Sequence, residues 1–154
     1  MSELHKACER RDSKRVNFLL SSENINTQNK DSETPLYIAS KYGDLNTVKV
    51  LMSREECNFT ITDRQDNTPL HIACLHGHHS VIEFLVADQR CWVNAMNGEG
   101  KTPLHMASEH GDLNADKNAT STFQMKEALP HYTQPASMVT TPQFNYLLLI
   151  RDVS

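Results

Sequence analysis

The sequence predicts an all-α fold: a solenoid of helix-turn-helix units with hairpin-like loops between them, followed by an irregular C-terminal tail. The first observation is a ten-residue string that recurs in register, as TPLYIASKYG from Thr34, TPLHIACLHG from Thr68 and TPLHMASEHG from Thr102. These starts lie 34 residues apart, and a fixed period of this length is typical of repeat architectures. The second observation is an aliphatic helical pattern after the first two strings. The third is a polar, turn-rich stretch that leads into the next string.

Each recurring string predicts a short first helix with a defined start and end. In the middle copy the Thr68 hydroxyl suits an N-cap, and Pro69 suits the first helical position, where its missing N–H would have had no partner. Gly77 can adopt a positive φ and end the helix. Between these ends, an apolar stripe of small residues indicates close packing against a neighbour. In the three copies the stripe comprises Leu36, Ala39 and Ser40, then Leu70, Ala73 and Cys74, then Leu104, Ala107 and Ser108.

The second helix of each unit is predicted from the aliphatic residues that follow the glycine. Polar stretches at 60–67 and 94–101 come next and predict the loops. Each unit is therefore expected to consist of a helix, a turn, a second helix and a hairpin-like loop. The residues expected to fill the second helix are Val48, Val50, Leu51 and Met52 in one unit and Ile82, Phe84, Leu85 and Val86 in the next.

A less complete copy precedes these units. The string LHKAC from Leu4 aligns with LHIAC of the middle copy, Arg11 stands where the other copies have glycine, and no Thr-Pro precedes it. Its many charges, which are of both signs, are interpreted as the solvated outer face that a terminal repeat needs. Its second helix is expected to be filled by Val16, Phe18, Leu19 and Leu20.

The last copy stops partway. Residues 111–114 repeat the letters GDLN of residues 43–46, but Asp116 and Asn118 then stand in place of Val48 and Val50. We therefore expect a repeat array over 1–114, with units at about 1–28, 29–62 and 63–96 and an incomplete unit at 97–114. Residues 115–154 show no repeat, and their Ser, Thr, Gln and Pro content predicts a disordered tail.

This pattern resembles the ankyrin repeat, whose signature combines T-P-L-H-x-A with a period of about 33 residues. Three openings match it, and TPLHIA in the middle copy matches every fixed letter. The resemblance implies an extended concave face that binds other proteins. It therefore implies a non-catalytic protein–protein interaction module with another protein as its partner.

Composition restricts the compartment and the class of partner. A formal net charge of −4 disfavours binding to the phosphates of nucleic acids. The first residues lack the apolar stretch of a signal peptide, and the apolar run YLLLI at 146–150 is too short to span a membrane. The four cysteines show neither metal nor disulfide spacing, which indicates free thiols in a reducing compartment. We expect a cytoplasmic or nuclear monomer that neither inserts into membranes nor binds nucleic acid.

Eight histidines raise the question of a metal or catalytic site. The resemblance implies a structural role for His71 and His105, with each imidazole bonded to backbone near the adjoining loop. Tyr37 stands at this position in the second unit and is expected to weaken that contact. The run HGHH at 76–79 resembles a metal cluster, but its glycine breaks the helix, so its side chains need not share a face. No motif places a Cys or Ser beside a His and a carboxylate, and we expect no cofactor, no metal and no enzymatic activity.

The resemblance places partner contacts on the loop tips and on the exposed side of the first helices. Tyr42, Leu75 and His76 are favoured as anchors, because aromatic and apolar groups on a polar surface suit binding hot spots. Ser32 and Asp66 stand where this loop usually carries glycine, so their loops are expected to be less regular. The candidate partner-binding residues are Lys30, Asp31, Glu33, Lys41, Tyr42, Arg64, Gln65, Asn67, Leu75, His76, Glu99, Lys101, Glu109 and His110.

Three narrower hypotheses stay open at this point. The chain could be a fragment or truncated variant of a larger ankyrin-repeat scaffold or channel arm. It could instead be a short regulator that competes with a full-length relative for the same partner. A metal-binding or enzymatic protein built on the cluster His76–His79 would require at least three ligands to converge on one point.

Overall fold

The structure is a computed structural model that describes residues 1–112, with side chains described as far as Glu109. The expected tail at 115–154 lies outside the described residues. Within residues 1–112 the chain is all-helical. Its helices are α1 (Glu3–Glu9), α2 (Ser13–Leu19), α3 (Pro35–Tyr42), α4 (Leu45–Met52), α5 (Pro69–His76), α6 (His79–Ala87) and α7 (Pro103–Asp112).

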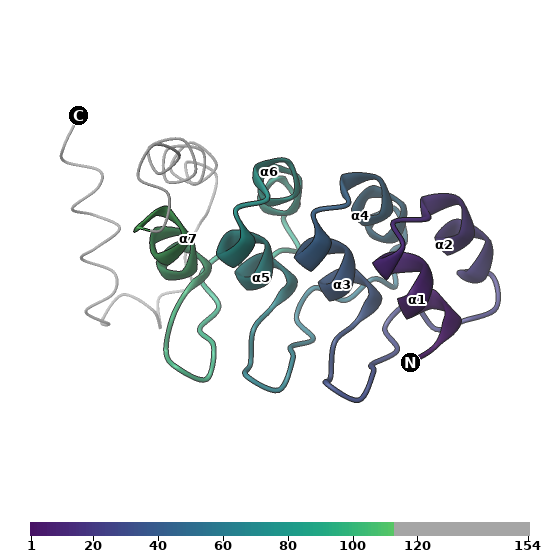
Figure 1. The fold of residues 1–154 in the computed structure, drawn as a ribbon, viewed down its shortest axis with the longest axis horizontal. Helices are drawn as coiled ribbons and strands as arrows, with labels where there is room; N and C mark the ends of the chain where they lie inside the picture. Colours follow the sequence, from purple (N-terminus) through teal and green to yellow (C-terminus); the bar gives the residue numbers. More distant parts are fainter. Residues whose placement is uncertain (113–154) are drawn as a thin grey trace.

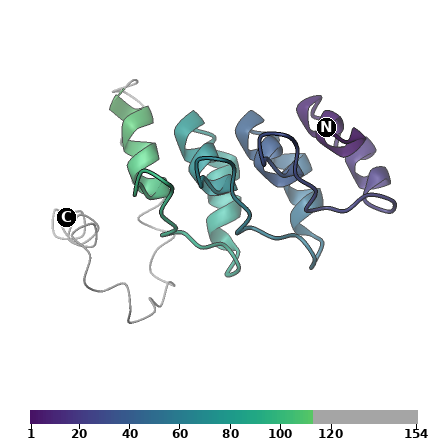
Figure 2. The ribbon, with the colours of Figure 1, turned by 90° about the horizontal axis from the view of Figure 1, so that it is seen from below.

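The helices form two layers, and the loops between units project to one side (Figure 1). The first helices α1, α3, α5 and α7 lie side by side in chain order, and the second helices α2, α4 and α6 form the other layer. Figure 2 shows the same units following one another along a single direction. Each first helix packs against the next first helix, and α1, α3 and α5 also pack against their own second helices. The predicted solenoid of helix-turn-helix units is confirmed.

The first helices start and stop on the predicted residues. Thr34 is the N-cap of α3, and its hydroxyl accepts a hydrogen bond from the Tyr37 N–H at 3.1 Å. Gly43 and Gly77 end α3 and α5 in the left-handed conformation, with φ of 69° and 67°. Gly43 is restricted for a second reason, since a Cβ there would lie 2.5 Å from Nδ1 of His78. A side chain at this position would both strain the backbone and displace that ring.

The first helices are buried on more sides than the predicted stripe. In α5, Leu70 and Cys74 belong to the stripe and are buried, but His71 and Ile72 lie outside it and are buried as well. The prediction of a single stripe was too narrow because α5 lies between α3 and α7 and also packs against α6. A first helix inside the array has neighbours on three sides and is therefore apolar nearly all round.

The prediction that Phe18 fills the core of the first unit is wrong, because its side chain is 66% exposed. The equivalent Phe84 of α6 is half-buried and lies beneath Lys49 of the preceding unit, with 5.6 Å between Nζ and the ring centroid. Helix α2 has no preceding second helix among the described residues. Its own Arg15 lies over the Phe18 ring instead, at 5.5 Å from the centroid.

The outer face of the first unit carries charges at positions that are buried in the other units. Lys6 stands at the position of Ile38 and Ile72, which are 1% and 5% exposed. Arg15 stands at the position of Val81, which is 1% exposed. Arg15 is exposed and Lys6 is only partly buried, so both charges reach water at the end of the array. These placements agree with the interpretation of this unit as a solvated end cap.

Ser40 lies in the core with an unused hydroxyl. Its side chain is 0% exposed, and the hydroxyl has no hydrogen-bond partner among the described residues. Leaving such a group unpaired costs about 1–3 kcal/mol. We expect Ser40→Ala to raise the free energy of unfolding by about 1 kcal/mol. Urea titration followed by circular dichroism measures this directly.

Ser108→Ala is the matched control, because Ser108 holds the equivalent position in α7 and is exposed. It reports the gain in helix propensity alone, which is at most about 0.7 kcal/mol. A gain at Ser40 no larger than the gain at Ser108 would contradict the assignment of an unsatisfied hydroxyl.

Candidate binding face

The three loops between units are built on the same side-chain frame. Asn29, Asp63 and Asn97 occupy equivalent positions, and one side-chain oxygen of each accepts hydrogen bonds from two backbone N–H groups of its loop. These six hydrogen bonds measure 2.8–3.0 Å. The backbone also closes each loop, as where the Asp63 N–H donates to the Asn67 carbonyl at 3.1 Å. The conformation of the loop tips is therefore held by the chain's own hydrogen bonds.

Ser32 and Asp66 do not make their loops irregular, and the prediction that they would is wrong. Both residues adopt the left-handed conformation, with φ of 64° and 62°, close to the 73° of Gly100. The N–H groups of the three residues donate equivalent hydrogen bonds to the carbonyl of the frame residue, at 3.0, 3.1 and 2.9 Å. A positive φ costs a non-glycine residue about 1–2 kcal/mol, which the shared frame offsets.

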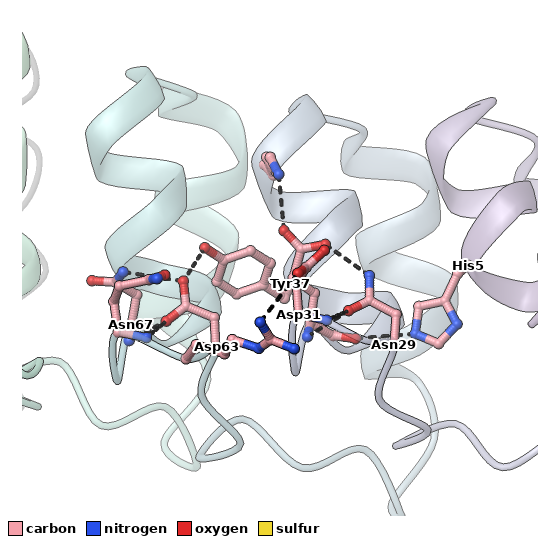
Figure 3. Close-up of polar contacts among 10 residues, drawn as sticks. His5, Asn29, Asp31, Tyr37, Asp63 and Asn67 are labelled. Carbon is pink, nitrogen blue, oxygen red and sulfur yellow. Dashed lines mark hydrogen bonds and ion pairs between the residues drawn. The ribbon is translucent and has the colours of Figure 1, made fainter. Parts of the chain in front are cut away.

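A buried histidine connects one unit to the loop of the next. His71 is 0% exposed, and its Nε2–H donates to the Lys101 carbonyl at 2.9 Å. Its Nδ1 accepts the Thr68 N–H at 3.1 Å, so the ring is neutral. Burial lowers the pKa of His71 below its ordinary value of 6.5. His5 forms the same link to the Glu33 carbonyl at 3.0 Å (Figure 3). The structural role that the resemblance implies for His71 is confirmed.

Tyr37 does not weaken this connection, contrary to expectation. Its hydroxyl donates to Oδ2 of Asp63, the frame residue of the next loop, at 2.5 Å (Figure 3). The network continues, since Asn67 donates to the same oxygen at 3.1 Å and Asn97 donates to Asn67 at 2.8 Å. Burial raises the pKa of Asp63, but the hydrogen bonds from Tyr37 and Asn67 outweigh it, and the net shift is downward. A phenol thus replaces the imidazole by pairing with a carboxylate.

Sequence analysis missed Asp63 as the partner of Tyr37. The signal was present in the repeat alignment. The frame position holds Asn29 and Asn97 in two loops but Asp63 in the loop that faces the one Tyr of the TPLH position. A hydroxyl that points at a loop needs an acceptor, and a carboxylate provides a stronger one than an amide.

The candidate anchors lie on the last turns of α3 and α5. Tyr42 is 38% exposed and His76 is exposed. Leu75, expected to point away from the packed stripe, is half-buried and packs against the core. The side chain of His110 lies outside the described residues.

The charged candidates are mostly paired with one another. Lys41 contacts Glu33 at 2.8 Å, and Lys101 contacts Glu109 at 2.6 Å and Glu99 at 2.9 Å. The hydrogen bond to Glu33 raises the pKa of Lys41. At the loop tips, the Arg64 guanidinium contacts the Asp31 carboxylate at 3.8 Å and also bonds the Lys30 carbonyl. Lys30 and Gln65 are exposed.

The HGHH run is used for packing between units. His78 donates from Nε2 to the Lys41 carbonyl at 2.9 Å, and its ring stacks on His76 with centroids 5.9 Å apart. Over the described residues, no group of three or more His, Cys, Asp or Glu side chains is arranged to hold a metal ion. His78 therefore helps to join the second and third units.

All four cysteine side chains are buried. Burial raises the pKa of Cys57 to about 11 and those of Cys8 and Cys91 to about 12, and it also raises the pKa of Cys74. They are protonated at neutral pH and act as small core residues rather than as nucleophiles.

Tyr37→Phe tests the link between the second and third units. The change removes a buried donor to a carboxylate, and hydrogen bonds to charged groups contribute about 1.5–3 kcal/mol. We expect a loss of that size in the free energy of unfolding, measured by urea titration. Tyr42→Phe is the control, since Tyr42 is exposed, and it should change stability by less than about 0.5 kcal/mol. Equal effects of the two variants would contradict the role assigned to the Tyr37 hydroxyl.

The lowered pKa of His71 predicts a loss of stability on acidification. Above pH 6.5 the imidazole is neutral in both states. As the pH falls below 6.5, the unfolded chain binds a proton that the folded chain does not, and stability falls until the lower folded pKa is reached. This group contributes a slope of at most about 1.4 kcal/mol per pH unit. Urea titrations across this range should show a smaller slope for His71→Gln than for the wild-type chain. An unchanged slope in His71→Gln would show that another group is responsible.

Comparison with protein-family models gives a match to ankyrin repeats in three copies, over residues 4–97 and 55–117. A search of the curated proteins found no match. None of the helices within residues 1–112 is both long and apolar enough to cross a membrane. Ankyrin repeats are generally protein-interaction modules and are typically non-catalytic. The match covers most of the chain and agrees with its caps, loops and stacked helices, and the chain belongs to the ankyrin-repeat family.

Proposed function

We propose that this chain is a non-catalytic module that binds another protein through the loop tips and the last turns of α3, α5 and α7. We call this surface the binding face. Its members are the candidate residues whose side chains are described: Lys30, Asp31, Glu33, Lys41, Tyr42, Arg64, Gln65, Asn67, Leu75, His76, Glu99, Lys101 and Glu109.

The observation that supports this proposal most strongly is that charged side chains of the binding face are paired with each other while Tyr42 is partly exposed. Lys41 is already paired with Glu33, and Lys101 with Glu109, while Tyr42 remains 38% exposed. A partner that covers Tyr42 gains apolar contact there. It does not have to remove an isolated charge from water, which would cost free energy. An amphipathic tyrosine among satisfied polar groups is a favourable hot spot.

The loops add a second argument. Each tip is held by the bonds to Asn29, Asp63 or Asn97, so its backbone is ordered in the free protein. Binding to an ordered surface avoids the entropy cost of fixing a flexible loop. The same frame that stabilises the array therefore prepares the tips for recognition.

The narrower hypotheses are compatible with this surface. Four buried, protonated thiols suit a reducing compartment, so we place the interaction in the cytoplasm or nucleus. A competitor of a longer ankyrin-repeat chain would use the same face, and so would a segment of a scaffold or channel arm. In each case we expect the chain itself to act as a monomer.

The experiment is affinity capture of partners by the full chain from a cytosolic extract, followed by titration of each purified partner. We expect Tyr42→Ala to weaken binding by about 1 kcal/mol or more, because it removes a partly exposed aromatic anchor. Isothermal titration calorimetry measures the change.

Phe18→Ala is the matched control, because Phe18 is an equally large exposed aromatic residue on α2, away from the binding face. It should leave the affinity unchanged. The reverse result, a loss with Phe18→Ala and none with Tyr42→Ala, would move the site to the outer end of the array and refute the proposal.

A further inference from the structure

Three equivalent residue pairs cross the binding face, one in each of the last three units. In each pair the first residue precedes the capping threonine, and the second lies in the last turn of the first helix. We call them cross pairs, and they are Glu33 with Lys41, Asn67 with Leu75, and Lys101 with Glu109.

The cross pairs of the second and fourth units are ion pairs in which the acidic and basic positions are exchanged. In the second unit the loop supplies the acid and the helix the base, at 2.8 Å. In the fourth unit the loop supplies the base and the helix the acid, at 2.6 Å. A partner that lies over either pair meets charges that already neutralise each other.

The middle cross pair is uncharged, and its polar atoms are used within the fold. The Asn67 amide nitrogen donates to Asp63 at 3.1 Å, and its oxygen accepts from Asn97 at 2.8 Å. Leu75 beside it is half-buried and apolar. An apolar side chain placed over this pair would leave no protein polar group without a partner, whereas a charged one would lose water and gain no counter-charge.

The fourth unit has a carboxylate, that of Glu99, in addition to the one in its cross pair. Lys101 contacts Glu99 as well as Glu109, so two acids surround one base. Glu99 is the most exposed of the three, with a side chain 70% exposed. On the second-unit side, Lys41 and Glu33 balance, and so do Arg64 and Asp31 at the loop tips. The exposed Lys30 adds one positive charge on this side. The binding face therefore carries a net positive charge on the second-unit side of the middle cross pair and a net negative charge on the other side.

We infer that the occupant of the binding face is a segment of a partner protein with an apolar side chain over Leu75 and a lysine or arginine beside it, over Glu99. This inference rests on the proposed function and adds the chemistry of the partner to it. The middle cross pair selects the apolar side chain, and the surplus carboxylate fixes the direction in which the segment lies.

The test uses a phage-displayed library of random linear peptides selected on the full chain. A parallel selection uses the double variant Asn67→Glu with Leu75→Lys, which copies the cross pair of the second unit into the third. Asn67→Glu loses the hydrogen bonds to Asp63 and Asn97, and Leu75→Lys loses packing on the core. We therefore expect a lower melting temperature with an unchanged helical spectrum, which circular dichroism checks before the selection. We expect peptides with an apolar residue next to a basic one to be enriched on the wild-type chain. The best of them should bind the double variant at least about tenfold more weakly in fluorescence anisotropy.

Glu99→Gln separates the two parts of the inference. It leaves Lys101 paired with Glu109 and makes the fourth unit neutral. On this variant the apolar preference should persist and the basic preference should disappear. Peptides that need Tyr42 but show neither preference would overturn the inference and leave the proposed function standing. Peptides whose binding changes neither with Tyr42→Ala nor with the double variant, or a selection that yields no binder to the wild-type chain, would overturn both.

Discussion

The fold depends on one interaction that recurs between units: a buried polar side chain of one first helix bonds to the loop of the next unit. His5 and His71 reach a backbone carbonyl, at 3.0 and 2.9 Å, and Tyr37 reaches the Asp63 carboxylate at 2.5 Å. An imidazole or phenol buried without such a partner would cost about 1–3 kcal/mol. A first helix therefore avoids this cost only when the loop of the next unit is folded. This dependence makes the folding of neighbouring units cooperative.

This interaction also decides what the histidines can do. The ring of His71 uses both nitrogens, one as donor to Lys101 and one as acceptor from Thr68, and it is 0% exposed. His78 uses Nε2 to join α3 to the third unit. A general base needs a free lone pair facing a substrate, and a metal ligand needs its nitrogen directed at an ion. Neither ring offers these, so His71 and His78 act as links between units.

The sequence predicted most of the fold because the signals were local and repeated. The Thr-Pro starts, the glycine stops and the aliphatic second helices are each read within one unit, and three copies remove chance. The predictions that were wrong concern neighbours. Phe18 is exposed because α2 has no preceding second helix in the described structure, and Leu75 is half-buried against the core. The residue pattern of one repeat does not show which elements of the neighbouring repeats pack against it.

The candidate site was harder to predict for a related reason. Ser32 and Asp66 stand where this loop usually carries glycine, which predicted irregular loops, yet both residues adopt the positive φ of Gly100 within the same side-chain frame. The Tyr37–Asp63 pair required two substitutions in different units to be read together. Pairing across the face, such as Lys41 with Glu33, likewise depends on distances that the linear sequence does not give.

The same geometry explains how a repeat protein can vary its recognition without cost to its fold. The frame residues Asn29, Asp63 and Asn97 are buried or half-buried and bond to backbone, so a change there alters the loop itself. The outer cross pairs form ion pairs, whereas Asn67 of the middle pair bonds to the frame residues Asp63 and Asn97. The bonds from the frame to the loop backbone are the same in all three loops, so the pair can be acid–base, base–acid or uncharged while the loop keeps its conformation. The second, third and fourth units of this one chain show all three versions. We therefore infer that selectivity depends on the partly buried cross pairs, whereas the buried links between units contribute to stability.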